Sequence, residues 1–536
     1  MSCPPCAHPV KVGGLCALCG AIVSTADGQL NSDSSRPNSP NTSPDSSPNS
    51  SPTKPKPKRA RKGPKNQSLT VSGGHTLRVS SSYASQHSLL ERKRLRSKRK
   101  LSLVLDLDHT LVHCVSDERA REHLGNDELR TFLLPFDNIK FPSPEDIFNA
   151  TNPFHCARHY LKLRPNLKAF LTSSHDLYEL TIYTAGTRYY ALKVAHAICR
   201  YIVGAEDVDY FNEENATEKE KEAIQLRKDM FGSRIVSRSD VGDLGANVKS
   251  LKRVFPDGGR MSVILDDRED VWANAKDNDR LFTGGRKGEP PSNLLYICPY
   301  RWSVFRAFDD VNNSSGADWG AQPPAQQQAE DDEYLTMTLD ILKRLHENFY
   351  AEGGGEPGEE HERAAPFLLQ QMRASVFPPG CKFVFSGLVS LQEQEQCRKF
   401  SETARLPITR YAEDLGATVV SAVDLDVTHV VAKRSGTEKC QRGAAVPGCA
   451  VVSVQWLMQC YWSLKNASIM RYLLCPINPK TEESENYRRA REKEKEEINN
   501  ATTTTTTKKT KDEENGGEND DESSDDDFAD GLLANF

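Results

Sequence analysis

Residues 101–114 have the sequence LSLVLDLDHTLVHC, in which an apolar run ends in two aspartates, Asp106 and Asp108, followed by Thr110. A short apolar run of this kind is typical of a buried strand. Carboxylates more often lie on solvated loops or helix faces, so a pair at the end of a buried strand suggests a catalytic role. Because side chains alternate along a strand, both carboxylates should lie on the same side of its end, where one can attack a substrate while the other handles protons.

Similar apolar runs alternate with helical patterns from about residue 101 to residue 308. The runs are LSLVLDLD, LYELTIYT, MSVILDD and NLLYIC, and RYYALKVAHAICRYI has helical spacing between the second and the third. This alternation predicts a parallel sheet covered by helices, with binding residues at the carboxyl ends of the strands. We therefore predict an α/β domain over residues 98–310.

Three further motifs supply partners for the two aspartates. Thr184 lies in YTAGT, Lys249 lies in NVKSLKRVFP, and VILDDREDVW contains Asp266 and Asp267. A carboxylate can attack phosphorus only if its charge and that of the phosphate are offset, and Mg²⁺ does this while preferring carboxylate, phosphate and water oxygens. A lone Asp-x-Asp pair is equally consistent with a capping or loop role, but the four elements together indicate phosphoryl transfer.

The composition predicts a chain that is only partly folded. Of its 536 residues 37% are hydrophobic, and the net charge of −6 combines a basic front with an acidic end, which should have different partners. There is no run of about 18 apolar residues, and Met1 is not followed by a basic and then an apolar stretch, so we expect neither a membrane span nor a secretory signal. Fourteen cysteines in an intracellular chain argue against a disulfide framework.

Polar, low-complexity stretches divide the chain. Residues 23–95 are rich in Ser, Pro and basic side chains, so we predict a disordered linker. Within it, KPKPKRARKGPK is typical of a nuclear localisation signal, although a solvated linker or a weak nucleic-acid patch has the same composition. Residues 331–350 should form a helix packed on the first domain through one face, and residues 476–536 should form a charged, disordered tail. The residues of that helix face are Leu335, Leu339, Leu342 and Leu345.

The first 22 residues contain the ligand types that hold zinc. Two Cys-x-x-Cys pairs with turn residues nearby are typical of a tetrahedral Zn²⁺ site, here a small knuckle. Two ligand sets are open, four cysteines or three cysteines with one histidine, and a reduced, disordered tail is the alternative. The residues concerned are Cys3, Cys6, His8, Cys16 and Cys19.

Six motifs follow one another over about residues 100–275, namely LVLDLDHTLVH, KLRPNLKAFL, YELTIYTAGTRYYA, IVSRSD, NVKSLKRVFP and ILDDREDVW. In this order they resemble the haloacid-dehalogenase-like phosphatases, and more closely the Fcp-type phosphatases that act on the carboxy-terminal domain of RNA polymerase II. The resemblance implies a haloacid-dehalogenase-like Rossmannoid parallel sheet. It also implies a Mg²⁺-dependent protein serine/threonine phosphatase that dephosphorylates the heptad repeats of that domain and promotes polymerase recycling.

The same resemblance assigns roles at the first motif. Asp106 would be the nucleophile that forms an aspartyl phosphate, and Asp108 would protonate the leaving oxygen and then activate water. Thr110 would orient this loop and help to bind the phosphate. Mg²⁺ would be held by Asp106, the backbone carbonyl of Asp108 and Asp267, with Asp266 as a ligand or beside one.

Other implied roles concern the phosphate and the substrate. Thr184 and Lys249 would hold phosphoryl oxygens, and Lys249 would also tie the acids together by charge pairing. Arg238 in SRSD and Tyr178 in LYEL occupy positions that the family uses near the substrate. His109 is expected to point away from the two acids and to have a structural role.

Residues 376–475 resemble a BRCT domain, a small α/β unit. The carrying motifs are CKFVFSGL, YAEDLGATVV, VTHVVAK and VVSVQWLMQCYW. Ser386 and Lys439 match positions that grip a phosphate in some such domains, by a hydroxyl hydrogen bond and a charge-assisted one. A single copy serves more often as a packing module, so both roles stay open. In Fcp-type enzymes this domain follows the catalytic one and helps capture the phosphorylated polymerase tail.

The acidic end of the chain has apolar residues at helical spacing, which is typical of a segment that folds when it binds a partner. These residues are Phe528, Leu532, Leu533 and Phe536. In Fcp-type phosphatases the comparable tail docks on the large subunit of transcription factor IIF, and an inert solubilising tail is the alternative. Ser523 and Ser524 precede further acids and resemble acidophilic kinase sites.

Together with the motifs, the resemblance implies a nuclear phosphatase acting on the phosphorylated tail of RNA polymerase II, and we expect no membrane partner and no direct contact to nucleic acid. Two rival functions remain. The first is a nuclear scaffold that recruits partners through its BRCT domain while the core is idle, and intact Asp106, Asp108, Lys249 and Asp267 speak against it. The second is a phosphatase of the same superfamily for another phosphorylated substrate, which would have no evident use for a BRCT domain and an acidic tail.

Overall fold

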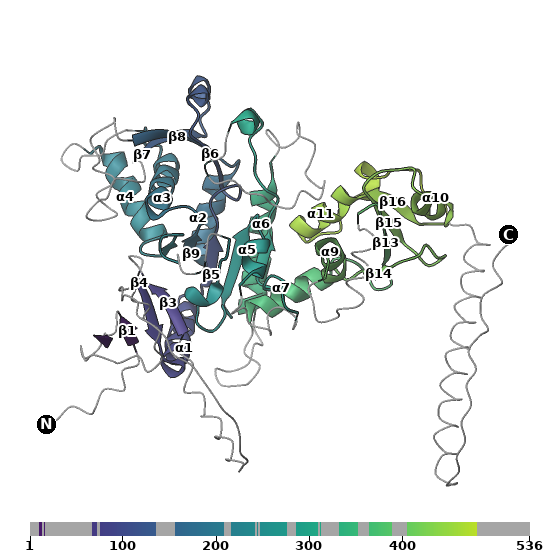
Figure 1. Cartoon of the computed structure of the whole chain (residues 1–536), viewed down its shortest axis with the longest axis horizontal. Helices are drawn as coiled ribbons and strands as arrows, with labels where there is room; N and C mark the ends of the chain where they lie inside the picture. Colours follow the sequence, from purple (N-terminus) through teal and green to yellow (C-terminus); the bar gives the residue numbers. More distant parts are fainter. Residues whose placement is uncertain are drawn as a thin grey trace, which may run out of the picture.

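A computed structural model describes the chain over two layered domains and a small N-terminal sheet (Figure 1). The described residues are 10–12, 15–16, 67–71, 75–135, 156–207, 216–241, 244, 247–275, 286–308, 311, 332–351, 364–388 and 405–479. Zinc candidates Cys3, Cys6, His8 and Cys19, the basic KPKPKRARKGPK stretch and the acidic tail lie outside them.

The first domain is built on a parallel sheet with the strand order β10-β9-β5-β11-β12. Its central strands are buried along their whole length, which is why their sequences are continuous apolar runs rather than alternating ones. The predicted α/β fold is therefore confirmed, and the four predicted strands are β5, β9, β11 and β12. The bounds are β5 Leu101–Leu105, β9 Tyr178–Tyr183, β10 Ile235–Val236, β11 Ser262–Asp266 and β12 Leu294–Tyr296.

Helices cover this sheet, and their ends follow local sequence signals. Thr187 accepts a hydrogen bond from the backbone of Tyr190 at the start of α3, and Gly204 ends that helix with a φ of 70°. The helix bounds are α2 Leu167–Leu177, α3 Arg188–Val203, α4 Glu218–Met230 and α5 Asp270–Ala273, with 3₁₀ turns η1 Glu118–His123, η6 Leu251–Arg253 and η7 Ser303–Ala307.

An antiparallel sheet, not predicted from the sequence, lies between β5 and α2 along the chain. Its order is β6-β8-β7, with β6 Val112–Val115, β7 Leu129–Pro135 and β8 Cys156–Leu163. The chain turns from β5 into this sheet at His109, which adopts a left-handed backbone with a φ of 59°. Strand β5 itself ends at Leu105, and this turn follows directly after Asp108.

The predicted linker over residues 23–95 ends earlier than expected. Strands β1 Val10–Val12, β2 Leu15–Cys16, β3 Gln67–Val71 and β4 His75–Val79 form an antiparallel sheet, and α1 Ser81–Ser97 follows it. The polar α1 is anchored by ion pairs to distant residues, because Arg94 pairs with Glu179 and Arg92 pairs with Asp257. Local composition does not reveal such partners, so the sequence alone predicted disorder here.

The second domain is a four-stranded parallel sheet with the order β14-β13-β15-β16. Its strands are β13 Lys382–Ser386, β14 Thr418–Val420, β15 His429–Ala432 and β16 Ala450–Ser453, and its helices are α9 Pro407–Asp414, α10 Glu438–Ala445, α11 Val454–Ser463 and η8 Ile469–Arg471. Trp456 stacks on His429 in its core, with ring centroids 4.7 Å apart. Gly416 ends α9 with a φ of 97°, where a Cβ would lie 2.6 Å from the carbonyl oxygen of Ala374.

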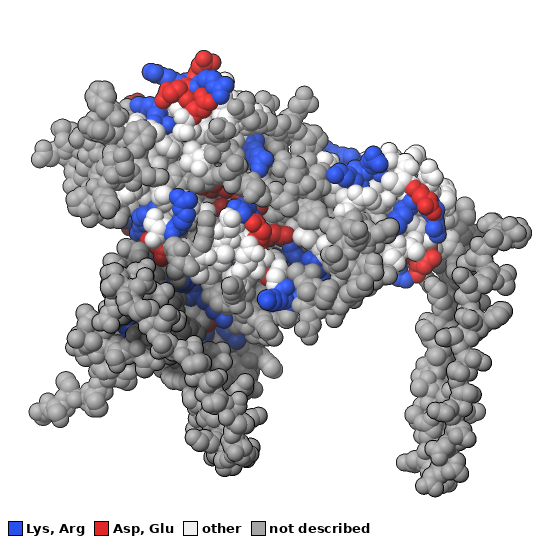
Figure 2. Space-filling view, viewed as in Figure 1, with Lys and Arg blue, Asp and Glu red and all other residues white. Residues whose placement is uncertain are grey.

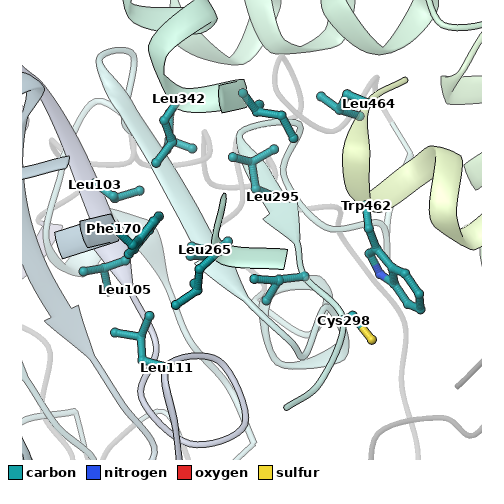
Figure 3. Close-up of a cluster of buried hydrophobic side chains, with 14 of the residues drawn as sticks. Leu103, Leu105, Leu111, Phe170, Leu265, Leu295, Cys298, Leu342, Trp462 and Leu464 are labelled. Carbon is teal, nitrogen blue, oxygen red and sulfur yellow. The ribbon is translucent and has the colours of Figure 1, made fainter. Parts of the chain in front are cut away.

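The two domains share one hydrophobic core through a pair of helices, α6 Tyr334–Tyr350 and α7 Ala365–Ala374 (Figure 1). Helix α6 packs against α2 of the first domain, as its leucine spacing predicted, and also against α11 of the second. Figure 3 shows this continuity in side chains from β5, α2, β11, β12, α6 and the end of α11. They include Leu103, Phe170, Leu265, Leu295, Leu342, Trp462 and Leu464.

The surface carries charges of both signs. On the face drawn in Figure 2, Lys and Arg side chains of the described residues lie in small groups among Asp and Glu side chains. Among the described helices, none is long and apolar enough to cross a membrane.

Candidate active site at the carboxyl edge of the sheet

The carboxyl ends of three adjacent strands bring the predicted site residues together. Asp106 directly follows β5, Thr184 follows β9, and Asp266 is the last residue of β11. Since β9, β5 and β11 are neighbours in the sheet, these side chains meet at one edge although up to 160 residues separate them in the sequence. This is the edge where open α/β sheets bind ligands.

Lys249 bridges two of the carboxylates. Its Nζ atom lies 2.7 Å from Oδ1 of Asp106 and 2.6 Å from Oδ2 of Asp266. The side chain is buried, and its backbone N–H donates to the carbonyl oxygen of Val271 at 2.9 Å. Burial alone would lower the pKa of Lys249, but the two carboxylates raise it above its ordinary value, so the lysine is positively charged.

The two aspartates at the carboxyl end of β11 have different partners. Asp266 accepts hydrogen bonds from the indole N–H of Trp272 at 2.8 Å and from the backbone N–H of Arg268 at 2.8 Å. Asp267 accepts a hydrogen bond from the hydroxyl of Thr110 at 3.0 Å, and its own N–H donates to that hydroxyl at 3.1 Å. Thr110 therefore ties the loop after β5 to the loop after β11.

These acids form a group that suits a cation. Oxygen atoms of Asp106, Asp266 and Asp267 all lie within 4.8 Å of one another, and all three side chains are buried. Burial raises the pKa of each carboxyl group to about 6, and Lys249 opposes this shift only in part. One ammonium group does not offset three carboxylates, and hard oxygen donors are the ligands that divalent cations such as Mg²⁺ prefer. The residues present thus fit a divalent cation.

Asp108 differs from the other acids because it is only partly buried. The hydroxyl of Tyr190, in the first turn of α3, donates a hydrogen bond to Oδ1 of Asp108. Burial and the negative charge of Asp108 raise the pKa of Tyr190 well above its ordinary value, so the tyrosine stays protonated. Tyr190 lies within the motif YTAGTRYYA, but nothing in that motif predicted this contact.

His109 is buried and is not one of the three acids, although its electrostatic interaction with Asp267 lowers the pKa of that carboxyl group. Its carbonyl oxygen accepts from the backbone N–H of Tyr300 at 2.6 Å, and its Nδ1 atom lies 3.1 Å from the carbonyl oxygen of Tyr300. These contacts hold the left-handed turn after Asp108, which agrees with the expected structural role.

Thr184 lies at the expected edge, where its hydroxyl accepts a hydrogen bond from the N–H of Gly186 at 3.0 Å. Arg238 follows β10, and its backbone N–H donates to the carbonyl oxygen of Gly186 at 3.0 Å, so its exposed side chain starts from the same edge.

The expected position of Tyr178 near the substrate is wrong. It begins β9, pairs with Leu101 at the opposite end of β5, and donates its hydroxyl to Leu342 in α6 at 2.7 Å, so it has a packing role far from the acids.

A buried arginine, Arg164, holds the loop after β5 through a hydrogen bond to its backbone. Nη1 of Arg164 donates to the carbonyl oxygen of Thr110 at 2.8 Å, and Nη2 donates to that of Cys298 at 2.8 Å. Its charge pairs with Asp332, just before α6, at 3.1 Å. Arg164 lies within the motif KLRPNLKAFL, but its role could not be predicted because its three partners are far apart in the sequence.

The second domain places Ser386 and Lys439 at the same end of β13. The hydroxyl of Ser386 lies 2.6 Å from that of Thr437, and Nζ of Lys439 donates to the carbonyl oxygen of Phe385 at 3.2 Å. The two polar groups that the sequence singled out are thus neighbours. Phosphate binding by them stays a prediction.

Of the predicted zinc ligands, Cys16 alone is among the described residues. It ends β2 and is buried. Ten cysteines are described, and all of them are free thiols.

Comparison with known proteins identifies both domains. Residues 101–281 match the family described as NLI interacting factor-like phosphatase, and residues 379–461 match the BRCA1 C Terminus (BRCT) domain. The chain joins an NLI interacting factor-like phosphatase domain to a BRCT domain. The phosphatase match contains every residue of the acid cluster, and the BRCT match contains Ser386 and Lys439.

The chain is also similar to curated proteins that are named as C-terminal domain phosphatases of RNA polymerase II. The one from Schizosaccharomyces pombe is 25% identical over 557 residues, covering 88% of this chain and 67% of the relative. The one from Caenorhabditis elegans is 26% identical, covering 71% of this chain and 47% of the relative, and the human one is 30% identical, covering 50% and 20%. The chain therefore spans from about two thirds to a fifth of the length of these relatives.

A solved structure of a fission yeast RNA polymerase II CTD phosphatase Fcp1 variant bound to beryllium fluoride has a similar fold. The TM-score is 0.51 at 24% identity, with 72% of this chain and 100% of that chain covered. A second structure, of Fcp1 described as an essential RNA polymerase II CTD phosphatase, covers 72% of this chain and 99% of that chain with the same TM-score of 0.51 and 24% identity. The fold of both domains together is therefore that of these structures.

Proposed function

We propose that this protein is a Mg²⁺-dependent protein serine/threonine phosphatase that removes phosphate from the heptad repeats of the carboxy-terminal domain of RNA polymerase II. The observation that carries the proposal is Lys249 bridging Asp106 and Asp266 at the strand ends, beside Asp267. The proposed substrate comes from the relatives, which are named as phosphatases of the C-terminal domain of RNA polymerase II. Promotion of polymerase recycling follows from that substrate.

In the proposed mechanism Asp106 is the nucleophile. Its free carboxylate oxygen attacks the phosphorus atom, the bond from phosphorus to the seryl oxygen breaks, and an aspartyl phosphate forms. Asp108 gives a proton to the leaving oxygen and later takes one from the water that hydrolyses the aspartyl phosphate. Tyr190, in the first turn of α3, donates a hydrogen bond to the Asp108 carboxyl and holds it in place.

The metal would be held by Asp106, Asp267 and the backbone carbonyl of Asp108, with Asp266 as a ligand or beside one. When bound, Mg²⁺ would act as a Lewis acid that offsets the charge of the phosphoryl oxygens. Lys249 and Thr184 would bind phosphoryl oxygens at the same edge, and exposed Arg238 would meet the substrate next to Gly186.

Other parts of the chain fit this function as further proposals. The BRCT domain would help capture the phosphorylated tail, with Ser386 and Lys439 as a phosphate site. The acidic end would bind the large subunit of transcription factor IIF, the basic stretch would direct the protein to the nucleus, and the N-terminal cysteines would bind Zn²⁺. These proposals rest on the sequence and on the relatives.

The direct test is phosphate release from synthetic heptad peptides that carry phosphoserine at different positions. We expect release with Mg²⁺ and loss of release with a chelator, because three buried carboxylates then lack their cation. Release that persists with chelator would overturn the metal mechanism. Absence of release from every phosphopeptide, alongside turnover of phosphorylated nucleic-acid ends or metabolites, would instead favour a phosphatase for another substrate. No turnover of any phosphate ester would favour the scaffold with an idle core.

Replacing Asp108 with asparagine should slow the enzyme by roughly 10²- to 10⁴-fold, since general acid–base catalysis contributes this much and the residue acts in both half-reactions. The variant keeps Asp106, so the phosphoenzyme should still form and should accumulate. Intact-mass measurement after rapid quenching should show one added phosphoryl group per chain. Normal turnover by Asp108→Asn would refute the acid/base role, and Asp127→Asn, an equivalent change in the loop before β7, serves as the matched control.

A further inference from the structure

The loop that follows β11 is held from outside the phosphatase domain. Glu269, two residues after Asp267, accepts a hydrogen bond from the hydroxyl of Tyr411 at 2.7 Å and pairs with the guanidinium of Arg410. Both partners belong to α9 of the BRCT domain. We call the three side chains, Glu269, Arg410 and Tyr411, the clasp.

The BRCT side of the clasp is rigidly packed. Arg410 is 5% exposed, its guanidinium lies 4.8 Å from the ring centre of Tyr411, and Nη1 lies 3.3 Å from the hydroxyl of Tyr461 in α11. Tyr411 in turn stacks on Tyr296 at the end of β12, with ring planes 11° apart. A buried arginine held on several sides is a fixed anchor, because a planar guanidinium with multiple partners has little freedom left.

The phosphatase side of the clasp leads directly into the acid cluster. The carbonyl oxygen of Glu269 accepts from the N–H groups of Trp272 and Ala273, at 3.2 and 2.9 Å, and so starts the single turn of α5. That turn supplies the indole that binds Asp266. It also supplies the carbonyl of Val271 that accepts from the N–H of Lys249. One residue therefore organises the supports of Asp266, a member of the acid cluster, and of Lys249, which bridges it to Asp106.

Helix α5 spans only Asp270–Ala273, and a helix this short has no stability of its own in water. Its position must come from tertiary contacts. We propose that the BRCT domain acts as a positioning element for the metal-binding loop: the clasp fixes Glu269, and through α5 it sets the positions of Asp266, Asp267 and Lys249. This inference rests on the proposed metal-dependent phosphatase function, and it assigns the BRCT domain a role in the chemical step besides capture of the substrate.

The same interface contains a matched control. Arg405 of the BRCT domain pairs with Glu289 of the phosphatase domain, with Nη2 to Oε2 and Nε to Oε1 both at 2.9 Å. This ion pair has the chemistry of the clasp and ties the same two domains. Glu289 lies in a different segment, before β12, and its carboxylate accepts hydrogen bonds from Arg405, although it lines the same cavity as Glu269 and Ala273.

The experiment compares Glu269→Gln and the milder Tyr411→Phe with Glu289→Gln in the full chain. Replacing a group that supports a metal ligand typically costs about 10- to 100-fold in metal affinity. Glu269→Gln should therefore weaken Mn²⁺ binding by about 10-fold, and Tyr411→Phe should weaken it by less. Calorimetry measures both affinities. In metal-free protein, hydrogen exchange over residues 267–273 should become faster in Glu269→Gln. Hydrolysis of para-nitrophenyl phosphate should require a correspondingly higher Mg²⁺ concentration, while Glu289→Gln keeps all three wild-type values.

Two results would overturn the inference. One is unchanged exchange and unchanged metal affinity in both clasp variants, and the other is an equal loss in Glu289→Gln, which would show that the interface acts only through global stability. Thermal unfolding identifies that second case, because the midpoints of the clasp variants and of Glu289→Gln would then all fall. If the wild-type chain hydrolyses no phosphate ester, the proposed function fails, whereas the exchange and metal-binding measurements still decide the role of the clasp.

Discussion

Asp106→Asn is expected to abolish phosphatase activity, with a loss of roughly 10⁴- to 10⁶-fold in kcat, the range seen when one member of a catalytic triad is removed. An amide cannot attack phosphorus as a carboxylate does, and neither Asp266 nor Asp267 can replace it. Asp266 is engaged by Lys249 and Trp272, and Asp267 is engaged by Thr110. Steady-state hydrolysis of a phosphoserine heptad peptide measures the effect.

The fold should survive this change. Burial raises the pKa of Asp106, so the charged carboxyl destabilises the metal-free protein at neutral pH, and a neutral asparagine of the same size should not lower the midpoint of thermal unfolding. Asp257→Asn is the matched control, since Asp257 pairs with Arg92 of α1 and its replacement should leave activity unchanged. Full activity in Asp106→Asn would contradict the assignment of the nucleophile, and unfolding of that variant would leave Asp108→Asn to decide the mechanism.

Lys249→Met should cause the largest loss of stability of any single change at this site. Removing one partner of a buried ion pair costs about 3–5 kcal/mol, because the remaining charge is left uncompensated in the interior. Here two carboxylates, Asp106 and Asp266, lose their shared cation, and activity should fall with it because the phosphate also loses its positive partner. Urea unfolding in the presence of a chelator measures the free energy of unfolding.

The loss caused by Lys249→Met should depend on pH. Lys249 lowers the pKa of Asp106 and Asp266, so without it the folded-state pKa of each carboxyl group should rise further above its unfolded value. The charged carboxylates then destabilise the fold at high pH, whereas the protonated groups at low pH do not. The difference from wild type should therefore shrink as the pH falls from 8 to about 5. Lys162→Met is the control: Lys162 is as buried but pairs with Glu128, which is 30% exposed, so its removal should cost less and show little pH dependence. An equal cost in both variants would show that the acid cluster does not depend on Lys249.

Much of the site could be predicted because its residues stand directly at the ends of apolar runs. Asp106, Thr184 and Asp266 each follow or end a buried strand, and parallel strands bring their carboxyl ends to one edge whatever their separation in the chain. The error at Tyr178 has the same origin. That residue begins its strand, so it lies at the opposite edge, and a resemblance of motifs does not distinguish the two ends of one strand.

The contacts that support the site could not be predicted in this way. Tyr190 reaches Asp108 across 82 residues, Arg164 reaches Asp332 across 168, and Arg410 reaches Glu269 across 141. Each contact depends on how separate elements pack, and no local pattern of charge or hydropathy encodes it. Helix α1 was missed for the same reason, since the acids that pair with its arginines lie in β9 and before β11.

By itself the sequence determined the α/β class, the strand ends that carry the chemistry, and the two domains, because buried strands need continuous apolar runs and catalytic groups must interrupt or end them. Only the tertiary structure decided which charges neutralise each other and what holds them in place. It placed Lys249 between Asp106 and Asp266, and it placed the BRCT domain against Glu269. The physical reason is that the energy of a buried charge depends on neighbours a few ångströms away, whereas hydrophobic periodicity is a property of a single segment.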